Sequence, residues 1–202
     1  MLLIKMLKIL NNKVLLFLAV LLFISSCEES YIPKPRGYYR LALPKKEYKE
    51  VQAPQFSLEI LKSCNFKIKE SDSTWTTIDY PLLNASLYLT FFHNNDIAKL
   101  TEDARKSAYK HAIKADEIIN MPFAIPEKHL YGMIYSIEGN AASPVIFQFT
   151  DSISQFLHGA VYFNSEPNAD SLKPVVAFVR QDIEHIIETF KWNATTEKQE
   201  KP

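Results

Sequence analysis

The chain of 202 residues is poor in the features that mark several classes of protein. Its two cysteines are too few for a framework of disulfides. Its four glycines exclude a flexible linker protein or a collagen-like chain. Its 23 basic and 23 acidic residues balance, so it lacks the basic excess typical of proteins that bind nucleic acid. What remains is the composition of an ordinary globular domain.

The sequence also lacks the local motifs of common catalytic and ligand-binding sites. It contains no glycine-rich phosphate loop, no Gly-x-Ser-x-Gly elbow and no Cys-x-x-Cys pair. No two of its five histidines stand three to five residues apart, so the local spacing of a zinc site is missing. We therefore expect no enzymatic activity, no metal and no cofactor.

Three histidines and one acid are the candidates for polar groups in a site. His158 lies on a predicted strand and is expected to be packed rather than to bind a ligand. Asp182 and His185 stand one helical turn apart and could form a base and its orienting group. On a charged helix face, however, a solvated pair is the preferred interpretation. His111 is expected at the surface or edge of a helix.

The first residues have the pattern of an export signal. Lys5, Lys8 and Lys13 precede an unbroken apolar run of eleven residues, 14–24. This run is shorter than the ~20 residues that a membrane-spanning helix needs. A basic start, a short apolar run and small residues behind it are typical of a secretory signal. We predict that residues 1–26 are this signal, and that their removal changes the net charge from zero to −3.

Cys27 closes the predicted signal and has a defined chemical role. The sequence Ile-Ser-Ser-Cys at 24–27 resembles the lipobox of bacterial lipoproteins, in which small residues fit the peptidase and the cysteine sulfur accepts the lipid. We predict that Cys27 is lipidated, with palmitate as a typical acyl chain. One acyl chain binds membranes weakly, whereas two or three give a stable anchor. An ordinary cleaved signal with an incidental cysteine is the alternative.

A basic and aromatic segment, residues 31–49, follows the predicted anchor, and we call it the collar. It contains six basic residues, one acid and four tyrosines, and its three prolines favour an extended path. Two interpretations remain open: a docking strip for lipid phosphates or a partner protein, or an extended arm that lies against its own domain. Single-stranded nucleic acid would suit the composition but is rejected for an exported protein. The residues predicted to bind a partner are Lys34, Arg36, Tyr38, Tyr39 and Arg40.

The body of the chain, residues 54–192, is predicted to be a single domain. Residues 27–53 would be the lipidated N-terminus and arm, and residues 193–202 a disordered polar tail. Alternating or β-branched apolar residues predict strands at 56–60, 66–69, 74–80, 85–92, 129–137, 144–149 and 155–163. Apolar residues at every third or fourth position predict helices at 96–119 and 171–191.

The ends of these helices are predicted from their local residues. Pro122 and Pro126 are expected to stop the first helix. Asp170 or Ser171 is expected to cap the second helix, with Pro174 in its first turn. Consecutive short strands favour antiparallel pairing. We predict an α+β fold with a mostly antiparallel sheet of about six to seven strands, covered by two main helices. Its order of elements is similar to the PsbP/Mog1-like α/β/α sandwich.

Two smaller features have ordinary structural interpretations. Cys64 lies in a strand-like stretch and is expected to be a buried apolar residue. Three Asp-Ser-x tripeptides begin at Asp72, Asp151 and Asp170, and turn and cap chemistry explains all of them. They also resemble the O-glycosylation tripeptide of exported Bacteroidota proteins, which we keep as a side hypothesis.

Two longer segments of the sequence resemble the gliding-motility lipoproteins of the GldD family of Bacteroidota. The first is Pro-Lys-Pro-Arg-Gly-Tyr-Tyr-Arg at 33–40. The second includes Asp-Ser-Ile-Ser-Gln-Phe-Leu-His-Gly at 151–159 and ends with Asp-Ile-Glu-His-Ile-Ile-Glu-Thr-Phe-Lys-Trp at 182–192. The resemblance extends from Cys27 to Trp192. It implies a non-enzymatic envelope lipoprotein that is required for gliding and works beside machinery coupled to type 9 secretion. Of the family's features, only Cys27 carries over as a chemically defined site.

The preferred hypothesis is therefore a membrane-anchored structural or assembly factor, with other proteins of the gliding and secretion machinery as partners. The alternative is a periplasmic ligand-binding or enzymatic lipoprotein with a pocket between sheet and helix, near His158 or His185. We expect an outer-membrane location with the domain facing the periplasm. Glu28 and Glu29 resemble an acidic signal for export to the cell surface, which is the alternative location.

Overall fold

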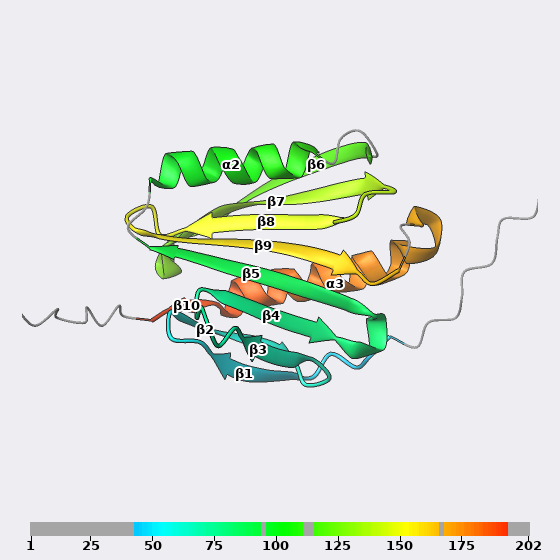
Figure 1. Ribbon diagram of the computed structural model, residues 1–202, viewed down its shortest axis with the longest axis horizontal. Helices are drawn as coiled ribbons and strands as arrows, with labels where there is room; N and C mark the ends of the chain where they lie inside the picture. The colour runs from blue at the N-terminus through cyan, green and yellow to red at the C-terminus, as the bar shows by residue number, and fades with distance from the viewer. Residues whose placement is uncertain (1–42, 94–95, 111–114, 166–167, 194–202) are drawn as a thin grey trace, which may run out of the picture. The chain divides into compact units, whose positions relative to one another are not determined.

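The computed structural model describes residues 43–93, 96–110, 115–165 and 168–193. Seven of its strands form one antiparallel sheet in the order β3-β4-β5-β9-β8-β7-β6 (Figure 1). This sheet confirms the predicted α+β class and its antiparallel pairing. The strands are β3 (Asn65–Ile68), β4 (Trp75–Tyr80), β5 (Ala85–His93), β6 (Ala115–Ile125), β7 (Leu130–Gly139), β8 (Val145–Thr150) and β9 (Gln155–Phe163).

A second, three-stranded sheet has the order β1-β2-β10. Its strands are β1 (Tyr48–Gln52), β2 (Phe56–Leu61) and β10 (Lys191–Trp192). Only β2 was predicted. Strand β10 has two residues and pairs with β2 from a distant part of the chain. Strand β1 is short and shows little alternation of apolar and polar residues. Strand β1 lies within the segment predicted to be an arm, so the last residues of that segment are paired into the domain.

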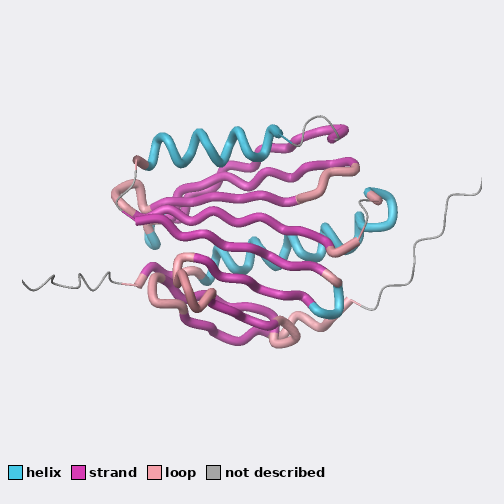
Figure 2. The backbone as a smooth tube through the Cα atoms, viewed as in Figure 1, coloured by secondary structure: helices cyan, strands magenta, loops and turns pink. Residues whose placement is uncertain are grey.

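Two helices, α2 (Ile97–Tyr109) and α3 (Ala169–Thr189), pack on opposite faces of the large sheet. Neighbouring residues of β7 show this arrangement, since successive side chains of a strand point to opposite faces. Ile134 belongs to the main core, which includes the buried stripe of α3. Tyr135 belongs to a smaller cluster with Ala108 of α2. In Figure 2, α3 runs behind the strands together with the small sheet.

The predicted first helix, residues 96–119, is nearly twice as long as the observed helix. Helix α2 ends at Tyr109, and Ala115–Ile125 form strand β6 instead. The alanines of this region continue a helical period, which concealed the change to alternation at Met121, Phe123 and Ile125, whose side chains pack against the main core. Pro122 does not stop a helix but lies within β6. Because β6 is the edge of the sheet, a residue without an N–H is tolerated there.

The predicted start of the last helix is also wrong in detail. Asn168, not Asp170 or Ser171, is the N-cap, and its side-chain oxygen accepts a hydrogen bond from the backbone N–H of Ser171 at 3.2 Å. Helix α3 begins at Ala169, so Pro174 lies inside the helix beyond its first turn. Its missing N–H leaves one carbonyl without its helical donor.

Two of the smaller expectations can be compared with the structure. Cys64 is buried with 1% exposure, as predicted, and burial raises the pKa of its thiol to about 12. Asp72 accepts a hydrogen bond from the backbone N–H of Thr74, and Asp151 accepts bonds from the backbone N–H groups of Ile153, Ser154 and Gln155. These are the local turns that the Asp-Ser-x sequences predict.

Candidate functional site

The sequence-predicted site residues divide into those that the structure describes and those that it does not. Cys27, the collar residues Lys34, Arg36, Tyr38, Tyr39 and Arg40, and His111 lie outside the described residues and stay predictions. The described candidates are His158, Asp182 and His185. The described end of the collar, residues 45–48, is called the strap below.

The strap is held against helix α3 by side-chain contacts. The ammonium group of Lys46 donates a hydrogen bond to the side-chain oxygen of Gln181 at 2.6 Å and lies 5.4 Å from the ring centre of Phe178. The ring of Tyr48 stacks on His185, with ring centres 3.6 Å apart and planes at 22°. The entry of the N-terminal segment into the domain is therefore fixed along one side of α3.

Asp182 is the most deeply buried charged residue beneath the strap, with 0% exposure. The hydroxyl of Tyr80, itself buried on β4, donates a hydrogen bond to Oδ2 of Asp182. Oδ1 is buried and has no hydrogen-bond partner among the described residues. Burial raises the pKa of the Asp182 carboxyl, and the bond from Tyr80 is the largest effect that opposes this rise.

The same buried carboxyl affects both tyrosines near it. Burial, followed by the negative charge of Asp182, raises the pKa of Tyr48 and raises that of Tyr80 well above its ordinary value. Both phenols therefore remain protonated donors at neutral pH. The expectation that Asp182 and His185 form a solvated pair is wrong, because the helix face that carries Asp182 points into the core.

His185 contacts the strap and does not pair with Asp182. Its Nε2 lies 2.8 Å from Oε2 of Glu59 on β2, while its ring stacks on Tyr48. The two residues suspected as a base and its orienting group therefore face different partners. Their geometry joins β1, β2 and α3, which is a structural role.

A cleft lies where the first turns of α3 pass the ends of β7 and β9. Figure 1 shows how these three elements are arranged. The cleft has a volume of about 250 Å³. Its walls are mostly apolar, and charged side chains stand among them. The lining residues are Ile137, Glu138, Gly139, Ala141, Ala142, Pro144, Tyr162, Phe163, Ser165, Asn168, Ala169, Leu172, Lys173, Val176, Ala177 and Arg180.

The cleft carries two cations and one carboxylate. None of the ion pairs among the described residues includes Lys173, Arg180 or Glu138. Arg180 makes a long hydrogen bond, 3.5 Å, to the hydroxyl of the buried Ser136. The sequence analysis missed this site, although Lys173 and Arg180 stand seven residues apart on a helix and thus share a face. The other wall is supplied by the end of β9, which lies just before α3 in the chain, and by the end of β7, which lies about thirty residues before it.

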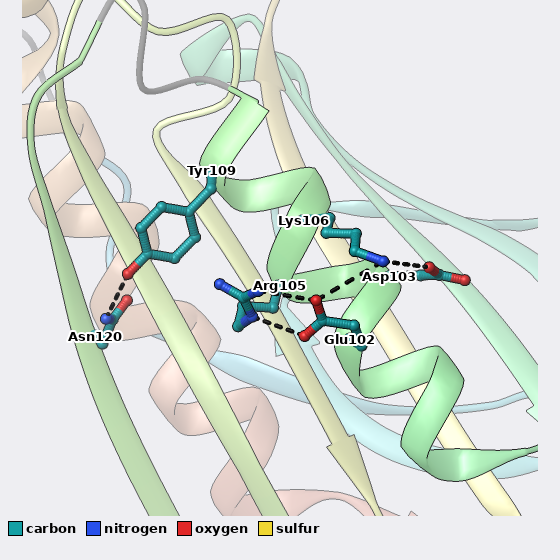
Figure 3. A network of polar contacts seen from close by, with 6 residues as sticks. All are labelled: Glu102, Asp103, Arg105, Lys106, Tyr109 and Asn120. Atoms are coloured by element: carbon teal, nitrogen blue, oxygen red, sulfur yellow. Dashed lines mark hydrogen bonds and ion pairs between the residues drawn. The ribbon is translucent and has the colours of Figure 1, made fainter.

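Two cations of helix α2, Arg105 and Lys106, present the opposite situation, because acids of the same helix neutralise their charges (Figure 3). The guanidinium of Arg105 donates two hydrogen bonds of 2.8 Å to Glu102 and lies 5.7 Å from the ring centre of Tyr109. Lys106 lies 3.7 Å from Glu102, and Asn120 of β6 donates to the hydroxyl of Tyr109 at 2.9 Å. Such exposed pairs support a helix locally, and they leave little free charge for a partner.

A second hollow lies between α2 and the outer face of β4, β5 and β9. Trp75, Phe92 and Phe156 line it together with His158 and Asp103. His158 lies on β9, as predicted, and burial lowers the pKa of its imidazole, so the ring is neutral at neutral pH. The hollow does not bring His158 near His185, which packs on the strap.

The described residues contain no group of three or more His, Cys, Asp or Glu side chains placed to hold a metal ion. No helix in the described part of the chain is long and apolar enough to cross a membrane.

Comparisons with known proteins add two findings. The family model of the gliding motility lipoprotein GldD matches residues 28–192. Among solved structures, the chain is similar to cyanobacterial PsbP (CyanoP) from Synechocystis sp. PCC 6803, with 7% identity, a TM-score of 0.44 and coverage of 78% of this chain and 98% of that chain. A similarity at this level carries nothing about function. No curated protein sequence matches the chain.

Proposed function

The chain belongs to the GldD family of gliding motility lipoproteins, and from this membership we propose that it is a membrane-anchored structural or assembly factor of the gliding and type 9 secretion machinery. The match over residues 28–192 is the observation that carries the proposal. It begins directly after Cys27 and covers every described element. The protein would act by holding a folded domain at a membrane and presenting a surface to other proteins of that machinery, without catalysing a reaction.

The anchor in this proposal is the lipid on Cys27. Fifteen residues lie between Cys27 and Leu43, the first described residue, and a fully extended chain from one to the other spans at most about 55 Å. The contacts of Lys46 and Tyr48 with α3 fix where this tether joins the domain. The domain would therefore stay within a defined distance of the bilayer, on a side set by the strap.

The collar is the first candidate for the partner surface. Its residues Lys34, Arg36, Tyr38, Tyr39 and Arg40 combine cations with tyrosines, and arginine and tyrosine are enriched among residues that dominate binding energy at interfaces. The position of these five residues between the anchor and the strap would keep them close to the membrane. We place the protein in the outer membrane with its domain in the periplasm, and the cell surface is the alternative. Protease treatment of intact cells distinguishes the two faces.

Anchoring and the collar can be tested together by motility assays on chromosomal variants. We expect Cys27→Ser to abolish lipidation, release the protein from membranes and stop colony spreading. We expect the double variant Arg36→Glu and Arg40→Glu to stop spreading as well, with lipidation, abundance and folding unchanged. A double change of similar charge on α2, Lys99→Glu with Lys110→Glu, is the control and should spread normally. Normal spreading of the Cys27→Ser strain would refute the anchor, and normal spreading of the collar variant would remove the collar.

The alternative, a ligand-binding lipoprotein, is favoured by one observation, the cleft between sheet and helix α3. Its polar groups are Lys173, Arg180 and Glu138 and not the histidines expected from the sequence. Such a set can hold a charged ligand in place. It supplies no nucleophile paired with a base, so binding is the function that it supports.

A further inference from the structure

We propose that the cleft beside helix α3 binds an acidic, apolar peptide segment of a partner protein, with Lys173 and Arg180 pairing with its carboxylates. The inference deepens the proposed function and rests on it, because it assigns a second partner surface to a factor that works through partners. Neither the family match nor the two sequence segments that resemble the GldD family assign a function to this cleft.

The size of the cleft indicates a part of a longer chain and not a whole small molecule. Its volume is about 250 Å³, below the ~300–1,000 Å³ of pockets that enclose small ligands. Leu172, Val176 and Phe163 form an apolar wall that one or two aliphatic side chains can cover. A segment that inserts such side chains and continues past the cleft at both ends fits this shape. The edge of the cleft at Tyr162, which is 39% exposed, is open and leaves room for the segment to continue.

The charges of the cleft select an acidic occupant. Lys173 and Arg180 have no carboxylate partner among the described residues, whereas Arg105 and Lys106 of α2 are paired with Glu102. Glu138 leaves the cleft with a net positive charge. An incoming carboxylate would gain a charge-assisted hydrogen bond from Arg180 in a partly apolar setting, where such bonds are stronger than on an open surface.

The spacing of the two cations predicts the pattern of the partner. Lys173 and Arg180 are seven residues apart on α3, which is about 10.5 Å along the helix axis. In a peptide with the polyproline II conformation, which has three residues per turn, residues three apart share one face and lie about 9.3 Å apart. The matching segment therefore has two acidic residues separated by two apolar residues.

Binding can be measured with a defined probe on the purified, lipidated full chain in detergent. The probe is a fluorescein-labelled peptide with the core Glu-Leu-Leu-Glu, and its binding is followed by fluorescence anisotropy. Peptides with Lys-Leu-Leu-Lys and Glu-Ser-Ser-Glu cores test the charge and the apolar part. We expect saturable binding of the first peptide with a Kd of about 0.1–1 mM, and binding at least about tenfold weaker for the other two.

Charge reversal on the protein tests the location. The variant Lys173→Glu with Arg180→Glu should lose the Glu-Leu-Leu-Glu peptide by at least about tenfold and gain the Lys-Leu-Leu-Lys peptide, and this gain shows that the variant is folded. Lys99→Glu, at a similar place in the first turns of α2, is the matched control and should bind as the unchanged protein does.

Three results would overturn the proposal. The first is an absence of saturable binding by the acidic peptide, and the second is equal binding by the unchanged and the charge-reversed protein. The third is that glycerol phosphate, the soluble headgroup of an anionic lipid, displaces the acidic peptide or binds to the cleft when the peptide does not. That result would make a lipid the occupant. None of these results bears on the anchor, which the Cys27→Ser strain tests separately.

Discussion

Replacement of Tyr80 by Phe tests whether the buried pair with Asp182 holds the strap side of the domain together. The change keeps the aromatic ring, which is 2% exposed, and removes only the hydroxyl that donates to Oδ2 of Asp182. Because Oδ1 already has no partner among the described residues, the carboxylate would be left buried without a direct donor.

The magnitude follows from the kind of bond that is lost. A hydrogen bond to a charged group contributes about 1.5–3 kcal/mol, and one between neutral groups about 0.5–1.5 kcal/mol. We expect Tyr80→Phe to lower the free energy of unfolding by about 2–3 kcal/mol at pH 7, or the melting temperature by roughly 4–10 °C for a domain of this size. In a background with Asp182→Asn the same change should cost only about 1 kcal/mol, because the amide oxygen is neutral.

The pH dependence gives the sign of the effect independently. Burial raises the pKa of Asp182 in the folded state above the ordinary value of 3.8. This carboxyl therefore contributes stability that is fully present below pH 3.8 and is lost as pH rises through the folded pKa. The unchanged protein should gain stability relative to Asp182→Asn as the pH falls toward 3.8. The deficit of Tyr80→Phe should shrink over the same range, because a protonated Asp182 carries no charge that needs the donor.

Urea unfolding followed by circular dichroism measures these differences for the four proteins of the double-mutant cycle at pH 7 and pH 4.5. The coupling energy between the two positions isolates the pair from other effects of each change. A deficit for Tyr80→Phe that is the same at both pH values and in both backgrounds would refute the reasoning. It would show that the hydroxyl is lost without consequence for the buried charge.

Two further predictions concern the core. Gly159→Ala would place a Cβ within 2.8 Å of the ring of Phe147, its partner across β8 and β9, so we expect a loss of about 1–3 kcal/mol in urea unfolding. Phe147→Leu should recover part of this loss when combined with it, and a Gly159→Ala protein as stable as the unchanged one would contradict the packing. Cys64, buried with a pKa of about 12, should not react with a thiol reagent such as Ellman's reagent until the protein is unfolded in urea; rapid reaction in the folded state would place this thiol at the surface.

The large sheet was predictable because most of its strands carry their own signal. Ala85–His93 and Gln155–Phe163 alternate or are rich in apolar residues, and the turns between strands contain Gly139 and Asp151. Strand β6 was missed because Ala115 and Ile118 also fit a helical period, and the strand becomes evident only through its ladder with β7. The hydrophobic pattern of a segment predicts its secondary structure where one period, helical or strand-like, dominates. Where a segment fits both periods, as β6 does, pairing with a neighbouring strand decides its structure.

The site was less predictable than the fold. The sequence indicates a charged helix face at Asp182, which predicted a solvated position, but the stripe of Val179, Asp182 and Ile186 faces the core. The cleft joins helix α3 to the end of β7, about thirty residues earlier in the chain, and to the end of β9, just before the helix. Its lining could be named only after the order of the strands was known. Cys27, by contrast, is predicted from four consecutive residues, because its proposed role depends on local chemistry.

Strand β6 has a consequence for a protein held on a surface. It is eleven residues long and forms one free border of the sheet, and an unprotected border of this length can template a strand from another copy. Lipid anchoring would crowd many copies into two dimensions with the same border available. Pro122 interrupts the row of N–H donors in its middle, and Asp116 and Glu117 add repelling charge at its start. The border is therefore built to resist stacking into fibres while the domains remain side by side.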